Sequence, residues 1–285
     1  MPDEEAIPGG HMKIRVLGPM TLHHDDNSAT PTAPKPRSIL ALLLLHANQT
    51  VPVSAMVQEL WGDSPPVSAL TTLQTYILHL RRALSAALGI PTSEVAKTVL
   101  LTTPGGYFLR SVSDDFDLHT YNRLVASGRH ALAAGENGTA TDLLLDARKL
   151  WRGPALADVR PGRMLEPQVK RLEESHLTTI EQSIDARLRL GRHQEVLAEL
   201  SGLVSEYRLH ENLYAQFMVA LHRSGRREEA LRVFQRLRGT MTEELGLEPS
   251  KRVHVLQHAI LTDDPSLEVA PRKDGLVQLL DQIMR

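Results

Sequence analysis

The chain of 285 residues contains no cysteine, few aromatic side chains and no long apolar run. The absence of cysteine excludes disulfide bonds and thiolate metal sites and fits a reducing cytoplasm. The aromatic content of 4% favours cores made of leucine- and alanine-rich helices. The longest apolar run, Ile39–Leu45, is far shorter than the roughly 20 residues that cross a bilayer. We therefore expect a cytoplasmic protein, associated with the nucleoid if it binds DNA, without a membrane span or signal peptide.

Motifs of common catalytic centres are also missing. The sequence has no GxxxxGK[ST] phosphate loop, no nucleophile elbow and no zinc-protease motif. No receiver domain is evident, so control by aspartate phosphorylation is not indicated. His254 and His258 are four residues apart on an expected helix, but no third metal ligand accompanies them. We expect no enzymatic activity, no cofactor and no metal ion.

Charge is unevenly distributed along a chain long enough for two domains. Residues 11–112 contain eight Lys or Arg against five Asp or Glu, whereas the whole chain has a net charge of −2. A mildly basic first part joined to a neutral or acidic second part is compatible with a DNA-binding module that carries a protein-binding module.

The first hundred residues contain strand, helix and hairpin signals in a defined order. Short β-rich stretches predict a small antiparallel sheet, three helices follow, and the Pro-Gly-Gly of the last stretch predicts a β-hairpin. The expected strands are 13–18 and 20–24, the helices 35–48, 51–62 and 71–84, and the hairpin 97–110. Ser54 is the expected cap of the second helix and Gly62 its end. Strands, three helices and a terminal hairpin describe a winged helix-turn-helix.

The third helix, TTLQTYILHLRRAL, has an unusual polar face. Its apolar residues recur at positions that share one helical face, so that face should be buried: Leu73, Ile77, Leu80 and Leu84. The opposite face contains no acid, although solvated helices usually mix Glu and Lys. Its residues are hydrogen-bonding groups and cations, the types that contact phosphates and base edges.

Beyond residue 114 the strand signals stop and helical segments repeat. GRHQEVL begins at Gly191 and GRREEAL at Gly225, an offset of 34 residues. This is the period of tetratricopeptide repeats, in which stacked helix pairs bury one another's faces. Residues 263–275 are an expected linker to a short terminal helix.

These motifs together resemble the Streptomyces antibiotic regulatory protein family in its small form. The family joins an OmpR-type winged helix to a bacterial transcriptional activation domain. The resemblance covers roughly residues 12–262, through VLGP, LALLLLHAN, ELWGDSPP, LQTYILHLRRAL, PGGYFL, LWRGPALADV, LHRSGRREEALRVFQRLR and EELGLEPS. It implies a mostly α fold with a small β part. The expected parts are a tag or disordered start (1–11), the winged helix (12–112), the repeat domain (113–262) and the linker with its helix (263–285).

The resemblance also implies roles for individual residues. Helix 71–84 would be the recognition helix and 101–109 the wing. Thr72, Thr75 and His79 would contact base edges. Phosphate contacts would come from Thr71, Tyr76, Arg81 and Arg82, and from Lys35, Arg37 and Trp61. Thr103 and Tyr107 of the wing would lie against the minor groove.

The expected function is that of a sequence-specific DNA-binding transcription activator of a secondary-metabolite pathway. Its expected partners are promoter DNA with direct repeats, a second protomer on that DNA, and RNA polymerase with its sigma factor. The alternative is a helical-repeat scaffold whose winged helix binds protein rather than DNA.

Overall fold

The computed structural model describes residues 12–110 and 115–267, which form two compact units. The first unit contains the residues up to Ser127 together with Leu143–Ile180, and the second contains Gly128–Asp142 and the residues from Glu181 onward. The expected tag, and the expected terminal helix with most of its linker, lie outside the described residues. No helix among the described residues is long and apolar enough to cross a membrane.

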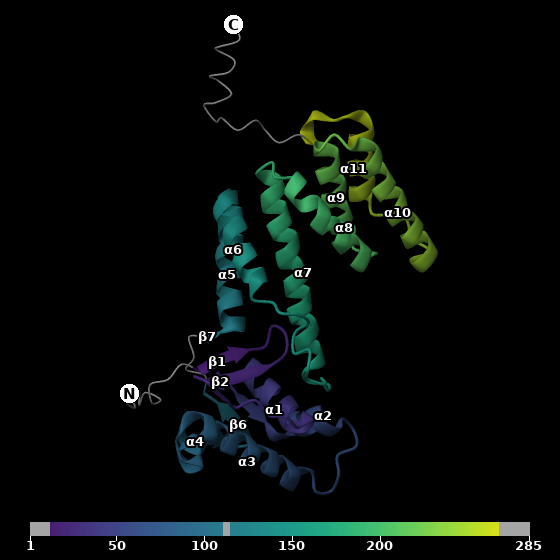
Figure 1. Ribbon diagram of the computed structural model, residues 1–285. Helices are drawn as coiled ribbons and strands as arrows, with labels where there is room; N and C mark the ends of the chain where they lie inside the picture. The colour runs from purple at the N-terminus through teal and green to yellow at the C-terminus, as the bar shows by residue number, and fades with distance from the viewer. Residues whose placement is uncertain (1–11, 111–114, 268–285) are drawn as a thin grey trace, which may run out of the picture. The chain divides into compact units, whose positions relative to one another are not determined.

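The first unit contains two small sheets (Figure 1). The four-stranded sheet has the order β3-β2-β1-β7, in which β1 pairs antiparallel with β2 and parallel with β7. The three-stranded sheet has the order β4-β6-β5 and ends in the expected hairpin. The strands are β1 (Met12–Arg15), β2 (Thr21–His24), β3 (Asn27–Ser28), β4 (Thr50–Pro52), β5 (Leu100–Thr103), β6 (Gly106–Leu109) and β7 (Asp115–Phe116).

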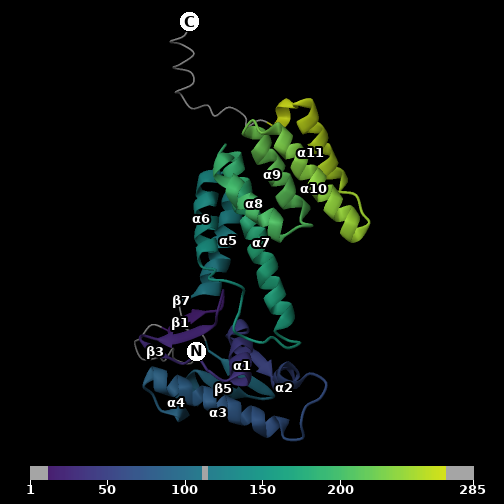
Figure 2. The ribbon, with the colours of Figure 1, turned by 45° about the vertical axis from the view of Figure 1, so that its right-hand side comes forward.

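Four helices lie between the strands of the first unit, one more than the sequence predicted. They are α1 (Pro34–Leu45), α2 (Val53–Trp61), α3 (Ala69–Leu88) and α4 (Thr92–Thr98). The unexpected helix α4 lies beside α3 in both views (Figures 1 and 2). The expectation for Ser54 was wrong: α2 begins at Val53 after Pro52, without a side-chain cap, whereas Gly62 ends it as predicted.

The core of the first unit does not stop at the hairpin. Buried side chains of α1 and α3 belong to one hydrophobic cluster with Phe116, Tyr121 and Leu165 from the following segment. That segment supplies parts of three helices: α5 (Asp117–Ala133), α6 (Asn137–Lys149) and α7 (Glu166–Arg189). The winged helix therefore shares its core with the start of the helical region.

An aromatic group lies within this shared region. The ring of Trp151 stacks on His176 with centroids 4.0 Å apart and planes at 5°, and it makes a T-shaped contact with Tyr121 with centroids 5.7 Å apart. The Tyr121 hydroxyl lies 2.8 Å from the Thr179 hydroxyl. Burial, with a smaller effect from the positive charge of Arg148, lowers the pKa of His176 to about 4. His176 is thus a neutral ring at physiological pH.

The second unit is helical and repetitive. Its complete helices are α8 (Leu197–Glu206), α9 (Glu211–Arg223), α10 (Arg227–Leu245) and α11 (Lys251–Thr262), with short 3₁₀ turns at Gln194–Val196 and Pro265–Leu267. The glycines 34 residues apart have the same conformation, φ +75° at Gly191 and +74° at Gly225. The next amide donates back to the helix at 2.9 Å in both turns, from Arg192 to the Arg187 carbonyl and from Arg226 to that of Leu221. Glycine adopts this left-handed conformation without strain, which explains the repeated residue.

Candidate nucleic-acid interface

Helix α3 separates an apolar face from a polar one, as its periodicity predicted. Leu73, Ile77, Leu80 and Leu84 are each 1% exposed and belong to the core of the first unit. The helix begins after the two prolines of DSPP and ends at Gly89, which has the left-handed conformation. No Asp or Glu occurs among its twenty residues. One long face is therefore free of negative charge.

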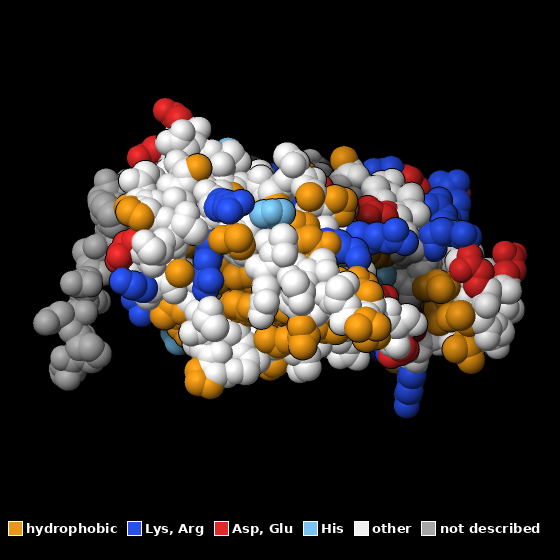
Figure 3. Space-filling model, turned by 90° about the horizontal axis from the view of Figure 1, so that it is seen from below, with side chains coloured by type: hydrophobic (Ala, Val, Ile, Leu, Met, Phe, Trp, Pro, Cys, Tyr) orange, Lys and Arg blue, Asp and Glu red, His pale blue; other side chains and the backbone are white. Residues whose placement is uncertain are grey.

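The predicted contact residues of α3 lie on its exposed side to different degrees. Thr71, Thr75, His79 and Arg82 are exposed, whereas Thr72 and Tyr76 are half-buried. The Thr75 hydroxyl donates to the Thr71 carbonyl at 3.0 Å, and its oxygen retains lone pairs that can accept from a base. In the view from below, uncharged side chains cover most of the middle of the surface, and charged side chains of both signs lie towards its edges (Figure 3).

Arg81 connects helix α3 to strand β5 of the hairpin. Its Nε and Nη2 donate to the Leu100 carbonyl at 2.9 and 2.8 Å, and Nη2 also donates to the Thr102 hydroxyl at 2.8 Å. Burial lowers the pKa of Arg81, and the nearby Tyr107 opposes this, but an arginine remains charged at neutral pH. The guanidinium thus holds β5 against α3. Its phosphate contact stays a prediction.

The two predicted wing residues differ in accessibility. Thr103, at the end of β5, is half-buried, with its hydroxyl 3.4 Å from that of Thr50. Tyr107 on β6 is 8% exposed and belongs to the core. A ring buried to this extent has little surface for a minor groove. The structure therefore corrects the expectation for Tyr107. Side chains alternate between the two faces of a strand, and Tyr107 lies on the face that meets the core.

The remaining predicted phosphate contacts lie on α1 and α2. Lys35 is exposed and its Nζ lies 4.8 Å from the centre of the Trp61 ring, a cation–π contact that keeps the charge at the surface. Arg37 forms an ion pair with Asp158 at 2.9 Å. Lys35 is thus an accessible cation, whereas Arg37 already has a carboxylate partner from the helical segment.

Sequence reasoning missed a set of carboxylates that join the winged helix to the helical segment. Glu59 of α2 is 6% exposed and accepts from the amides of Gly162 (2.6 Å), Met164 (2.9 Å) and Leu165 (3.0 Å). These amides precede α7, so Glu59 caps that helix from a distant part of the chain. A Cβ at position 162 would collide with the Glu59 carbonyl, which explains the glycine. Arg163 adds an ion pair to Asp63.

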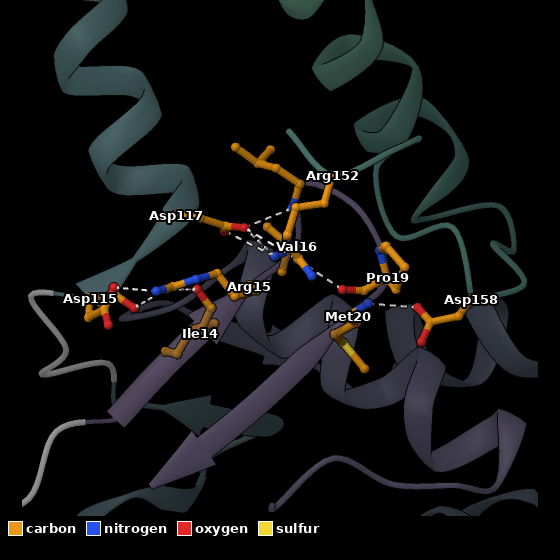
Figure 4. A network of polar contacts seen from close by, with 10 residues as sticks. Ile14, Arg15, Val16, Pro19, Met20, Asp115, Asp117, Arg152 and Asp158 are labelled. Atoms are coloured by element: carbon orange, nitrogen blue, oxygen red, sulfur yellow. Dashed lines mark hydrogen bonds and ion pairs between the residues drawn. The ribbon is translucent and has the colours of Figure 1, made fainter. Parts of the chain in front are cut away.

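A second contact network lies at the start of α5 (Figure 4). The Asp117 carboxylate accepts from the amides of Val16 at 2.9 Å and Leu17 at 3.1 Å, and Arg152 lies 3.7 Å away. Burial raises the pKa of Asp117, while these amides and Arg152 oppose the rise. Asp158 accepts from the Met20 amide at 2.7 Å. The only sequence signal for the contacts of Glu59 and Asp117 was a carboxylate on the buried side of a helix, and Asp158, which lies between α6 and α7, had none.

The fold and the acid-free face of α3 define a winged-helix DNA-binding regulator. Residues 27–108 match the family described as transcriptional regulatory protein, C terminal, and residues 116–261 match the bacterial transcriptional activator domain. The chain belongs to the Streptomyces antibiotic regulatory protein family, whose members are DNA-binding transcription activators and not a class of enzyme.

Individual relatives support this assignment. The regulatory protein DnrI of Streptomyces peucetius is 49% identical over 257 residues, covering 90% of this chain and 94% of DnrI. AfsR of Streptomyces coelicolor is 35% identical, but the match covers only 25% of that longer protein. The solved structure of Mycobacterium tuberculosis EmbR in complex with a low-affinity phosphopeptide has a TM-score of 0.83 at 31% identity. It covers 96% of this chain and 72% of EmbR.

Proposed function

We propose that the protein binds direct repeats overlapping the upstream promoter element of antibiotic or other secondary-metabolite genes. Two protomers bind side by side and recruit RNA polymerase and its sigma factor, in the cytoplasm at the nucleoid. The observation that carries this proposal is the exposed, acid-free face of α3 beside a wing that Arg81 holds in place. The names of DnrI and AfsR as regulatory proteins agree with the proposal.

The proposal assigns two kinds of contact to the described surface. Thr72, Thr75 and His79 read base edges, since hydroxyl and imidazole groups on one helix face can reach adjacent base steps. The exposed cations, chiefly Arg82 and Lys35, supply affinity without sequence information through phosphate contacts and counterion release.

Phosphate contacts are also assigned to further groups on α2 and α3. Thr71 and Tyr76 lie on the same helix as Arg82, and Trp61 lies beneath Lys35. Arg37 and Arg81 already contact protein groups, so their larger role is to hold Asp158 and β5 in position.

The test is binding of the full chain to promoter fragments and to random duplexes at increasing salt. Sequence preference should persist as salt rises, while affinity for both kinds of DNA falls. Thr75→Ala and His79→Ala should each relax preference at one or two positions per repeat by about 1–3 kcal/mol. Ser93→Ala, which removes an exposed hydroxyl from the neighbouring helix α4, is the matched control and should leave preference unchanged.

A transcription assay separates the activator from a scaffold. On a promoter that the protein binds, purified polymerase holoenzyme should produce more transcript when the full chain is present. A scaffold whose winged helix binds protein would show no sequence preference at any salt concentration and no promoter-dependent activation.

A further inference from the structure

The polar face of α3 contains two exposed leucines. Leu70 is 59% exposed and Leu78 is 40% exposed, and neither belongs to the hydrophobic core of the described residues. The view from below shows apolar side chains among uncharged polar ones over the middle of this surface (Figure 3). Of the two, Leu78 is the better candidate for a base contact, because it lies among the residues assigned to base contacts, whereas Leu70 lies at the start of the helix.

Helical spacing places Leu78 beside the base-reading residues. Leu78 follows Thr75 by three residues and precedes Arg82 by four, so the three side chains share one face. At 3.6 residues per turn, Leu78 and His79 lie on opposite sides of Thr75. Gln74 is four residues before Leu78, one turn earlier on the same row. A helix that brings Thr75 and His79 into the major groove therefore brings Leu78 to base edges as well.

The chemistry of this row matches one type of base pair. An exposed aliphatic side chain cannot pair with a base amino or carbonyl group, but it packs against the 5-methyl group of thymine. A glutamine amide such as that of Gln74 pairs with adenine in the same groove. The absence of acids on α3 and the exposed Arg82 favour a nucleic acid over a second protein chain as the occupant of this surface.

We propose that Leu78 is a specificity-determining residue that packs against a thymine methyl group in each operator repeat. The inference rests on the proposed function, because it requires that α3 enter the major groove. Leu78 then selects thymine over cytosine, which lacks this methyl group, without forming a hydrogen bond.

The experiment replaces thymine by deoxyuridine, which removes only the methyl group. The full chain first selects its site from a random duplex pool, and each thymine of that site is then replaced in turn. At one position per repeat the wild type should lose about fourfold in affinity, the factor for one buried methyl-sized group of roughly 0.8 kcal/mol. Leu78→Ala should bind the thymine and deoxyuridine sites equally at that position.

Two further variants keep the test interpretable. Leu78→Met retains an apolar contact and should retain most of the methyl effect, while Leu209→Ala removes an exposed leucine between α8 and α9 and should leave the whole effect. Circular dichroism confirms folding of each variant. If Leu78→Ala does not fold, Leu78→Gln takes its place, because glutamine keeps good helix propensity and removes the apolar contact, and it should likewise bind the thymine and deoxyuridine sites equally.

Several results would overturn the inference. A selected site without thymine, no methyl effect at any thymine, or an equal effect in Leu78→Ala would each exclude Leu78 as the reader while leaving sequence-specific binding intact. Loss of a dimer in Leu78→Ala without DNA, together with an unchanged deoxyuridine scan, would assign the leucine to contacts between copies of the chain. No enrichment of any sequence would instead refute the proposed function, and this inference with it.

Discussion

The cap that Glu59 provides to α7 should make this one carboxylate important for the stability of the first unit. In Glu59→Ala, the amides of Gly162, Met164 and Leu165 lose their acceptor. The buried Leu165 amide left without a partner costs about 1–3 kcal/mol, and the part-buried hydrogen bonds of Gly162 and Met164 contribute about 0.5–1.5 kcal/mol each. We therefore expect a loss of roughly 2–6 kcal/mol, a large share of the ~5–15 kcal/mol typical of a folded domain. Glu59→Gln retains an acceptor oxygen and should lose about 1–2 kcal/mol.

The chain offers a selective probe for this measurement. Its two tryptophans, Trp61 and Trp151, both lie in the first unit, so their fluorescence during urea unfolding follows that unit alone. Glu174→Ala, which removes an exposed carboxylate of α7, is the matched control and should change the free energy of unfolding by less than about 0.5 kcal/mol. A change in Glu59→Ala no larger than that of Glu174→Ala would refute the reasoning.

Three further predictions concern His176, the two arginines of α3 and the core that the winged helix shares with the helical segment. Because the pKa of His176 is lowered to about 4, the folded state resists protonation that the unfolded state accepts. The free energy of unfolding of the first unit should therefore fall by about 1–2 kcal/mol as pH falls from 6.5 to 4, a value reduced because solvent reaches the partly buried ring. His176→Phe should abolish this loss in urea titrations at several pH values. Arg81→Ala should destabilise the first unit by about 1–2 kcal/mol, whereas Arg82→Ala should leave stability unchanged and reduce the salt slope of DNA binding by about one; the reverse pattern would exchange their roles. A fragment of residues 12–180 should unfold cooperatively, whereas 12–112 should be far less stable because it lacks part of the core, and equal urea midpoints for the two would contradict the shared core.

Periodicity predicted those elements whose residues repeat regularly. The leucine stripe identified α3 and its buried face, and the glycines at 191 and 225 identified the repeat, because both signals are local in sequence. Helix α4 was missed because TSEVAKT is short and has a single buried residue, Val95. Tyr107 was misplaced because alternation along a hairpin does not say which face meets the core.

Contacts between distant residues could not be predicted from one sequence. Glu59 and Gly162 are 103 positions apart, and nothing in either local pattern refers to the other. Arg81 was predicted as a phosphate contact from the family resemblance, while its bonds to the Leu100 carbonyl depend on the packing of β5. Leu78 belongs to neither the apolar stripe nor the hydrogen-bonding set, so only its exposure in the structure points to a binding role.

The partners of Glu59 and Arg37 limit how regulators of this architecture can be recombined. If the winged helix alone were exchanged, with the cut in the segment 111–114, Glu59 and Arg37 would be replaced while their partners Gly162 and Asp158 stayed. The grafted winged helix would then have to supply groups that fit Gly162 and Asp158 of the recipient. A new operator preference should therefore be obtained by substituting surface positions of α3 or by exchanging the whole first unit. Exchange of the winged helix alone should fail.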